Sequence, residues 1–71
     1  MLNIMKSLDI VQKRFLKSGL SDYVYKLDLI KFAVKNRNRL LYITLLNELI
    51  SVVEDDCSVH PTDIEMLKKL R

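Results

Sequence analysis

The chain has 71 residues, 49% of them hydrophobic, and a net charge of +3 at neutral pH. A chain of this length buries only roughly 60% of the surface that it exposes when unfolded, so residues 1–71 form a single domain. The abundance of Leu, Ile and Val excludes a disordered or low-complexity chain, and the single cysteine excludes a disulfide framework.

Neither a targeting segment nor a membrane span is expected. Lys6 and Asp9 interrupt the N-terminal stretch that a signal peptide would need to be apolar. The longest apolar stretch, residues 40–53, is broken by polar side chains and is shorter than the roughly 20 apolar residues that cross a bilayer. The sequence therefore predicts a cytoplasmic protein without membrane contact.

Scarce Ala, Gly and Pro beside abundant Leu, Ile, Lys and Asn indicate an AT-rich coding genome, of bacterial or viral origin.

Apolar residues recur at helical spacing along the chain, which predicts an all-α fold, a small compact bundle of four helices completed by dimerisation. The first helix, residues 3–17, carries an apolar stripe of Ile4, Leu8, Val11 and Phe15. Gly19 ends it, because glycine adopts the left-handed conformation of a helix C-terminus without steric cost, and Leu20 folds back onto the helix.

The second helix, residues 22–35, is expected to begin at a cap formed by Ser21 or Asp22. At 100° per residue it has two apolar faces on nearly opposite sides. One consists of Tyr23, Leu27, Ile30 and Val34, and the other of Tyr25, Leu29 and Phe32. Between them lie Asp28, Lys31 and Lys35, so a core on one side cannot bury every apolar side chain of this helix.

Residues 35–39 contain no apolar side chain and are the expected turn into a third helix, residues 39–55. Because the turn has neither Gly nor Pro, a continuous helix over residues 22–55 is an alternative, and residues 40–46 also fit a strand. The apolar arc of the third helix covers about 200°, twice the roughly 100° of a one-sided surface helix. This width predicts a central helix.

A loop over residues 56–60 leads to a last helix, residues 62–71. Thr62 and Glu65 have the spacing of a capping box, with Pro61 just outside the helix. Ile64, Leu67 and Leu70 give this helix a narrow apolar edge.

The apolar residues exceed what a small bundle buries, and large exposed apolar patches mark interaction sites. We therefore expect a homodimer or an obligate protein partner. The candidate partner-binding residues are Tyr25, Leu29, Phe32, Leu41, Leu45 and Val52. In the alternative, a monomer packs Tyr25, Leu29 and Phe32 under the first or last helix.

Charge divides the chain, with a net +6 over residues 1–39 and −3 over residues 40–71. A basic cluster that could neutralise phosphates contains Lys31, Lys35, Arg37 and Arg39, and could be joined by Lys13, Arg14 and Lys17. A helix-turn-helix aligned on Gly19 fits poorly, because bulky Phe15 and charged Asp28 fall where the motif needs a small and an apolar residue. Nucleic acid is thus the alternative partner.

The only cluster of reactive residue types is at residues 55–60, where Cys57 and His60 could ligate zinc. The spacing favours a polar loop instead, with His60 bonded to a carboxylate and Cys57 half-buried. Glu54, Asp55 and Asp56 oppose the dipole of the third helix, a cost that could be offset by basic residues of the first two helices, in the same chain or in a dimer mate, or by a basic surface on another partner. The sequence shows no catalytic residue, metal site, cofactor or small-molecule substrate.

These observations predict a non-enzymatic protein–protein interaction module, acting as a regulator, an inhibitor or an assembly adaptor through the apolar faces of the second and third helices. The alternative is a dimeric nucleic-acid-binding regulator that uses residues 31–39. Salt separates the two, because phosphate binding weakens steeply as salt rises and an apolar interface does not.

Overall fold

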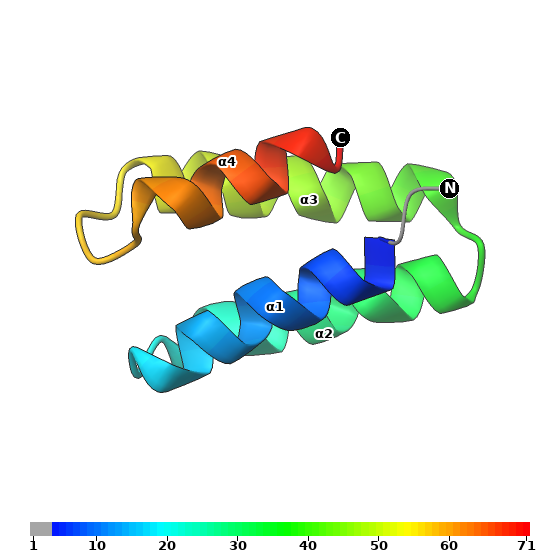
Figure 1. Ribbon diagram of the computed structural model, residues 1–71. Helices are drawn as coiled ribbons and strands as arrows, with labels where there is room; N and C mark the ends of the chain where they lie inside the picture. Colours follow the sequence, from blue (N-terminus) through cyan, green and yellow to red (C-terminus); the bar gives the residue numbers. More distant parts are fainter. Residues whose placement is uncertain (1–3) are drawn as a thin grey trace.

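The computed structural model describes residues 4–71, and these form four α-helices and no strand. The helices are α1 (Ile4–Lys17), α2 (Ser21–Lys35), α3 (Arg39–Glu54) and α4 (Pro61–Lys69). They run alternately up and down, with α1 and α2 in one layer and α3 and α4 in the other (Figure 1). The predicted four-helix bundle is confirmed. The continuous helix and the strand are wrong, and the expected start at Asn3 lies outside the described residues.

Each helix packs against two others. The contacting pairs are α1 with α2, α2 with α3, α3 with α4 and α4 with α1, so α1 and α3 are diagonal within the described residues. The prediction that the third helix is central is therefore wrong. In this square arrangement every helix turns one side to a shared core, and part of the wide apolar arc of α3 stays at the surface, at Leu40, Leu41 and Val52.

The core confirms the predicted stripes. It takes Leu8, Val11 and Phe15 from α1, Leu27 and Ile30 from α2, and five residues from α3. Val59 is buried as well, although it belongs to the loop between α3 and α4. The buried apolar residues are Leu8, Val11, Phe15, Leu27, Ile30, Ala33, Tyr42, Leu46, Leu49, Ile50, Val53, Val59, Leu67 and Leu70.

The turn between α1 and α2 has the predicted glycine C-terminus. Gly19 adopts a φ of 76°, and its N–H donates to the Leu16 carbonyl at 3.1 Å. The N–H of Leu20 donates to the Phe15 carbonyl at 2.9 Å, and Leu20 packs against the core. This pair of hydrogen bonds is a Schellman motif, which satisfies the last carbonyls of α1.

The turn between α2 and α3 has the same hydrogen bonds without a glycine. Arg37 adopts a φ of 54°, and its N–H donates to the Val34 carbonyl at 3.1 Å. The N–H of Asn38 donates to the Ala33 carbonyl at 3.0 Å. Asn38 also caps α3, since its Oδ1 accepts from the N–H of Leu41 at 3.1 Å. An arginine therefore holds a backbone conformation that glycine adopts without steric cost.

Two predicted caps are wrong. Helix α2 begins after Leu20 without a side-chain cap, because the preceding Schellman turn runs directly into it and places Ser21 inside the helix. Helix α4 is capped by His60, whose Nδ1 accepts from the N–H of Thr62 at 3.1 Å. Pro61 is therefore the first residue of α4 rather than a residue outside it, and the Thr62–Glu65 capping box does not form.

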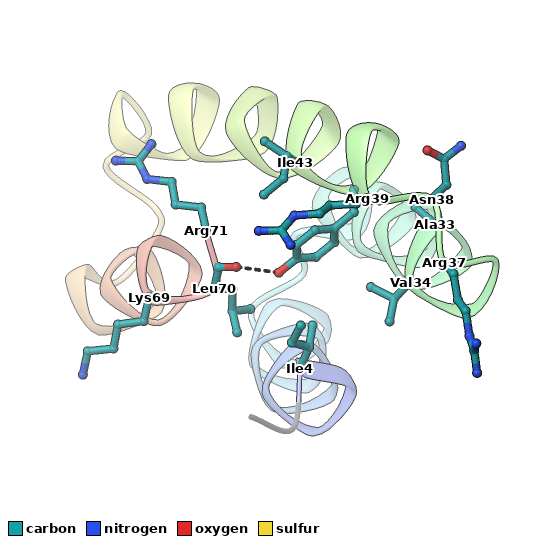
Figure 2. A pocket seen from close by; sticks show the side chains of 11 residues that line it. Ile4, Ala33, Val34, Arg37, Asn38, Arg39, Ile43, Lys69, Leu70 and Arg71 are labelled. Carbon is teal, nitrogen blue, oxygen red and sulfur yellow. Dashed lines mark hydrogen bonds between the residues drawn. The ribbon is translucent and has the colours of Figure 1, made fainter. Parts of the chain in front are cut away.

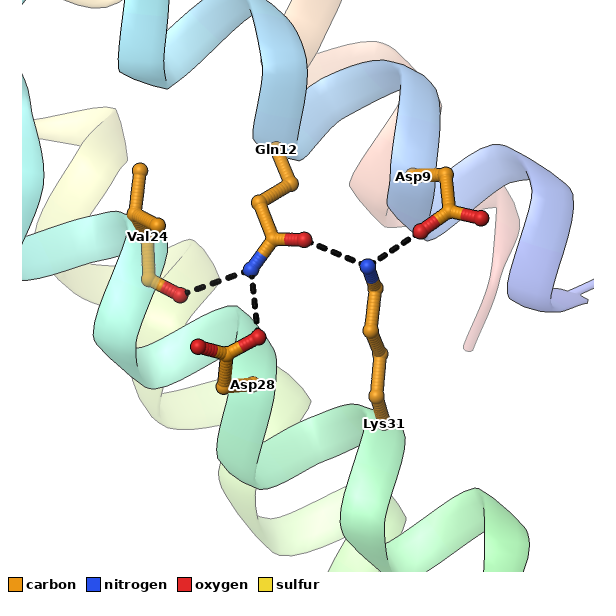
Figure 3. Close-up of polar contacts among 5 residues, drawn as sticks. All are labelled: Asp9, Gln12, Val24, Asp28 and Lys31. Atoms are coloured by element: carbon orange, nitrogen blue, oxygen red, sulfur yellow. Dashed lines mark hydrogen bonds and ion pairs between the residues drawn. The ribbon is translucent and has the colours of Figure 1, made fainter.

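Polar side chains join α1 to its two neighbours. The Nε2 of Gln12 donates to the Val24 carbonyl at 3.0 Å and to Asp28 Oδ1 at 2.7 Å (Figure 3). On the other side, Arg14 Nε lies 2.5 Å from Oδ1 of buried Asp63, outside hydrogen-bond geometry, so charge attraction alone balances that oxygen. These contacts fix α1 against α2 and α4.

Candidate functional site

The predicted partner-binding residues lie at the surface of two adjoining helices. On α2, the exposed fraction is 65% for Tyr25, 61% for Phe32 and 38% for Leu29. On α3, Leu41 and Val52 are exposed and Leu45 is half-buried. The alternative in which another helix covers Tyr25, Leu29 and Phe32 is therefore wrong.

The three α3 residues lie on the flank that faces α2. At 100° per residue, Leu41, Leu45 and Val52 fall within about 40° of one another. Val52 lines an open pocket together with Tyr23 and Lys26 of α2, whereas Asn47 and Glu54, on another side of α3, contact residues of the α4 segment. We call this surface the apolar face; it consists of Tyr25, Leu29, Phe32, Leu41, Leu45 and Val52.

The structure divides the predicted basic cluster in two. Lys31 Nζ donates to Asp9 and to Gln12 Oε1 of α1 (Figure 3). The hydrogen bond from Lys31 lowers the pKa of Asp9, and the charges of Lys13 and Lys35 lower it further. Lys35 follows Lys31 by four residues and therefore lies on the same flank of α2. Arg37 and Arg39 lie instead in and after the α2–α3 turn. The four residues do not form one patch.

Arg37 and Arg39 line a pocket that the sequence did not indicate. It is open, with a volume of about 390 Å³, and lies where the end of α2, the start of α3 and the end of α4 meet (Figure 2). Lys69 and Arg71 line it too. About thirty residues of sequence separate these two pairs of cations, so only the fold brings them together.

Tyr42 holds the end of the chain against this pocket. Its hydroxyl donates to the Leu70 carbonyl at 2.7 Å, and its side chain is buried. Burial raises the pKa of Tyr42 above its ordinary value, so the hydroxyl keeps its proton. The bond also satisfies a carbonyl at the C-terminus of α4 that has no partner within the helix.

Within the described chain, the loop that contains Cys57 and His60 makes contacts that stabilise the fold and no contacts that form a reactive site. Cys57 is exposed rather than half-buried, and His60 caps α4 rather than bonding to a carboxylate. Among the described residues, no three potential metal ligands come together. His60 does not bond to a carboxylate because its Nδ1 accepts from the N–H of Thr62 in the first turn of α4.

The negative charge at the C-terminal end of α3 is balanced by groups other than the predicted basic residues of α1 and α2. Glu54 pairs with Lys68 of α4 at 3.4 Å rather than with a basic residue of α1 or α2. Asp56 accepts a 2.5 Å hydrogen bond from the Tyr23 hydroxyl and a 2.8 Å bond from the N–H of Ser58. The bond from Tyr23 lowers the pKa of Asp56, and the same bond raises the pKa of Tyr23 to about 12.

No described helix combines the length and the hydropathy needed to span a bilayer. No protein-family model matches the chain, and comparison with curated proteins and with solved structures found no match either.

Proposed function

We propose that the protein is a small non-enzymatic protein–protein interaction module, acting as a regulator, an inhibitor or an assembly adaptor through its apolar face. The observation that supports this proposal is the exposure of Tyr25 and Phe32, 65% and 61%, beside four aliphatic side chains on the same face. Large exposed apolar patches mark interaction sites, and buried aromatic side chains supply much of the energy of protein interfaces.

The occupant that we propose for the apolar face is a second copy of the chain. A two-fold dimer brings the same patch of both subunits together, so the patch must be complementary to itself. Exposed Lys26 of α2 lines an open pocket with Val52 of the apolar face, and exposed Glu48 of α3 lies about 20° from Leu41 at 100° per residue. The two do not pair with each other within the described chain. In a dimer, Lys26 of each copy can meet Glu48 of the other around an apolar centre.

The test is the absolute mass from light scattering during gel filtration, for the protein and two aspartate variants of similar exposure. Leu29→Asp places a charge on the apolar face, and Ile10→Asp is the matched control, since Leu29 is 38% and Ile10 42% exposed. We expect a dimer for the unmodified protein and for Ile10→Asp, and a monomer with unchanged helical circular dichroism for Leu29→Asp. A monomeric unmodified protein would exclude the second copy as the occupant.

A nucleic-acid-binding regulator is the second candidate. What favours it is that Arg37 and Arg39 form no ion pair in the described part of the chain and have Lys69 and Arg71 nearby. What weakens it is the engagement of Lys31 with Asp9 and Gln12. Duplex DNA binding that falls steeply with salt, and is lost in Arg37→Glu/Arg39→Glu but kept in Leu29→Asp, would support this function over the first.

A further inference from the structure

The pocket between the α2–α3 turn and the end of α4 combines an apolar floor with a cationic rim. Its apolar lining comes from three helices and the α4 C-cap: Ile4, Ala33, Val34, Ile43 and Leu70. The hydroxyl of Tyr42, which also lines it, is already bonded to the Leu70 carbonyl. The floor therefore offers a ligand apolar contact and no free hydroxyl.

The rim carries four cationic side chains, Arg37, Arg39, Lys69 and Arg71, and none of the lining residues in the described chain is acidic. Arg39 extends its guanidinium toward the middle of the pocket and toward Leu70, while Arg37, Lys69 and Arg71 extend outward from its edges (Figure 2). All four are long side chains that change rotamer rapidly when exposed, so each can turn toward a bound anion.

Among the described residues, the four rim cations form no ion pair with a carboxylate, and neither do Lys13, Lys17, Lys26 and Lys35; what distinguishes the rim is that its four cations line one pocket. Arg14, Lys31 and Lys68 each pair with a carboxylate of another helix. Arg37, Arg39 and Lys69 have no such partner among residues 4–71, and Arg71 makes only a 3.4 Å contact to the Asn47 side chain. Like charges around one pocket repel one another, and a bound anion relieves that repulsion.

The backbone at Arg37 gives a further reason to assign a role to this pocket. A non-glycine residue at a φ of 54° is uncommon, and the left-handed conformation costs about 1–2 kcal/mol for a residue with a Cβ. The equivalent position of the α1–α2 turn is glycine. An arginine in this conformation at the pocket rim is explained if its exposed side chain turns over the pocket to bind a ligand.

We propose that this pocket binds a small anionic amphiphile, a molecule with a carboxylate or phosphate head and a short unbranched apolar body. The head lies against the cations, with the Arg39 guanidinium as the central donor, because arginine binds carboxylates and phosphates through two parallel hydrogen bonds. The apolar body lies on Ile43, Val34 and Leu70. The volume of about 390 Å³ lies in the lower part of the roughly 300–1,000 Å³ range of small-molecule sites.

The test is a titration of the methyl-labelled protein followed by NMR, with four probes that separate charge from apolar contact. Decanoate, below its critical micelle concentration, has both features of the ligand. Decyltrimethylammonium has the same tail with the opposite charge, inorganic phosphate has the charge alone, and a short DNA duplex carries phosphates without a tail. We expect saturable shifts of the Ile43, Val34 and Leu70 methyl signals with decanoate only.

Variants locate the head of the ligand. We expect Arg39→Ala to weaken decanoate binding at least about tenfold, because it removes both parallel hydrogen bonds to the head and the loss of one charge-assisted hydrogen bond alone has an effect of that size. Lys17→Ala is the matched control, because it removes one exposed positive charge from α1 outside the pocket, and its affinity is expected to stay unchanged. Circular dichroism verifies that both variants fold.

Several results would overturn this assignment. Equal binding of decyltrimethylammonium would mean that the tail alone is recognised, and equal shifts with inorganic phosphate would mean an unspecific anion effect. Shifts confined to Leu29, Leu41 and Leu45 would place the amphiphile on the apolar face. Preferential binding of the DNA duplex at the pocket would support the nucleic-acid function in place of this one.

Discussion

The two turns that reverse the chain after α1 and after α2 have the same hydrogen bonds and different residues at the left-handed position. The φ is 76° at Gly19 and 54° at Arg37, and the bond that closes each turn is 2.9 Å and 3.0 Å long. Geometry alone therefore does not decide which residue stands there. We interpret Gly19 as a residue that adopts the left-handed conformation without strain. We interpret Arg37 as a residue that is strained in this conformation and whose side chain has a function.

The ends of the bundle to which these turns belong also differ in chemistry. The Gly19 turn lies beside the hydrogen bond from Tyr23 to Asp56, and an open pocket there is lined by Asp22, Asp56 and Lys26. The Arg37 turn lies beside the bond from Tyr42 to Leu70, in a pocket whose charged lining residues are all cationic. Both ends have a tyrosine hydrogen bond, and they differ in that carboxylates and a lysine lie together at the first end, whereas the charged side chains that line the pocket at the second end are all cationic.

Replacing Gly19 tests whether this glycine stabilises the turn after α1, and we expect it to have the largest effect on stability. Nothing lies within 4 Å of a Cβ added at Gly19, so Gly19→Ala introduces backbone strain without a collision. We expect a loss of about 2 kcal/mol in the free energy of unfolding, measured by urea denaturation. The matched control is Arg37→Ala, which keeps a Cβ at the left-handed position and should change stability little. Equal losses in both variants would contradict the assigned difference.

Tyr42→Phe tests the anchoring of the α4 C-terminus at the cationic end. The change leaves the Leu70 carbonyl without its 2.7 Å partner at a buried position. We expect it to lower the free energy of unfolding by about 1.5 kcal/mol, the usual cost of an unsatisfied buried acceptor. Hydrogen exchange should show the α4 amides opening faster, and unchanged exchange there would mean that the hydroxyl does not hold the end of α4.

Tyr23→Phe is the equivalent change at the opposite end, where the hydrogen bond is only partly buried. We expect a smaller loss, about 1 kcal/mol at neutral pH. Thermal unfolding at neutral pH measures it. A loss of stability larger than that of Tyr42→Phe would contradict the expectation that the buried tyrosine hydrogen bond contributes more to stability than the partly buried one.

The same tyrosine makes stability depend on pH in a defined direction. Because the bond to Asp56 raises the pKa of Tyr23 from 10.0 to about 12, the folded protein holds this proton more tightly than the unfolded chain does. Its contribution is complete below pH 10 and is lost as pH rises toward 12. We expect Tyr23→Phe to reduce this alkaline loss, and the remainder comes from Tyr42, whose pKa is also raised.

The carboxylates act at the other end of the pH scale. The pKa values of Asp56 and Asp9 are lowered by their hydrogen bonds to Tyr23 and Lys31, so their stabilisation is present above about pH 3.8 and lost below it. Urea midpoints measured across both pH ranges check the two directions. A midpoint that does not fall at alkaline pH would contradict the Tyr23–Asp56 bond.

The helices could be predicted from the sequence because apolar periodicity and the turn after α1 are local signals. Gly19 indicates a helix end because glycine is the usual residue at that position. The turn at Arg37 had no such signal, and a continuous helix therefore fitted residues 22–55 as well. The His60 cap was missed for a similar reason, because Ser, Thr, Asp and Asn are the preferred caps and Thr62 stood two residues away.

The candidate sites show the same limit. The apolar face was predictable, since Tyr25, Leu29 and Phe32 lie on the side of α2 opposite its core stripe. The pocket was not, because Arg37 and Arg39 meet Lys69 and Arg71 only through the packing of α4 against α3. The pairing of Lys31 with Asp9 could not be predicted either, because it joins two helices whose packing the sequence does not reveal. Lys31 therefore falls into the basic cluster when the sequence alone is considered.

The most direct test of the difference between the two turns is a parallel measurement of Tm and decanoate Kd for Arg37→Gly and Arg37→Ala. Both variants lose the side chain, but only glycine relieves the left-handed strain. We expect both to bind decanoate several-fold more weakly, and only Arg37→Gly to gain about 0.5–1 kcal/mol of stability, a Tm increase of several degrees for a domain of this size. An Arg37→Gly variant that is no more stable than the unmodified protein, or that binds decanoate as tightly, would contradict the interpretation of Arg37 as a strained binding residue.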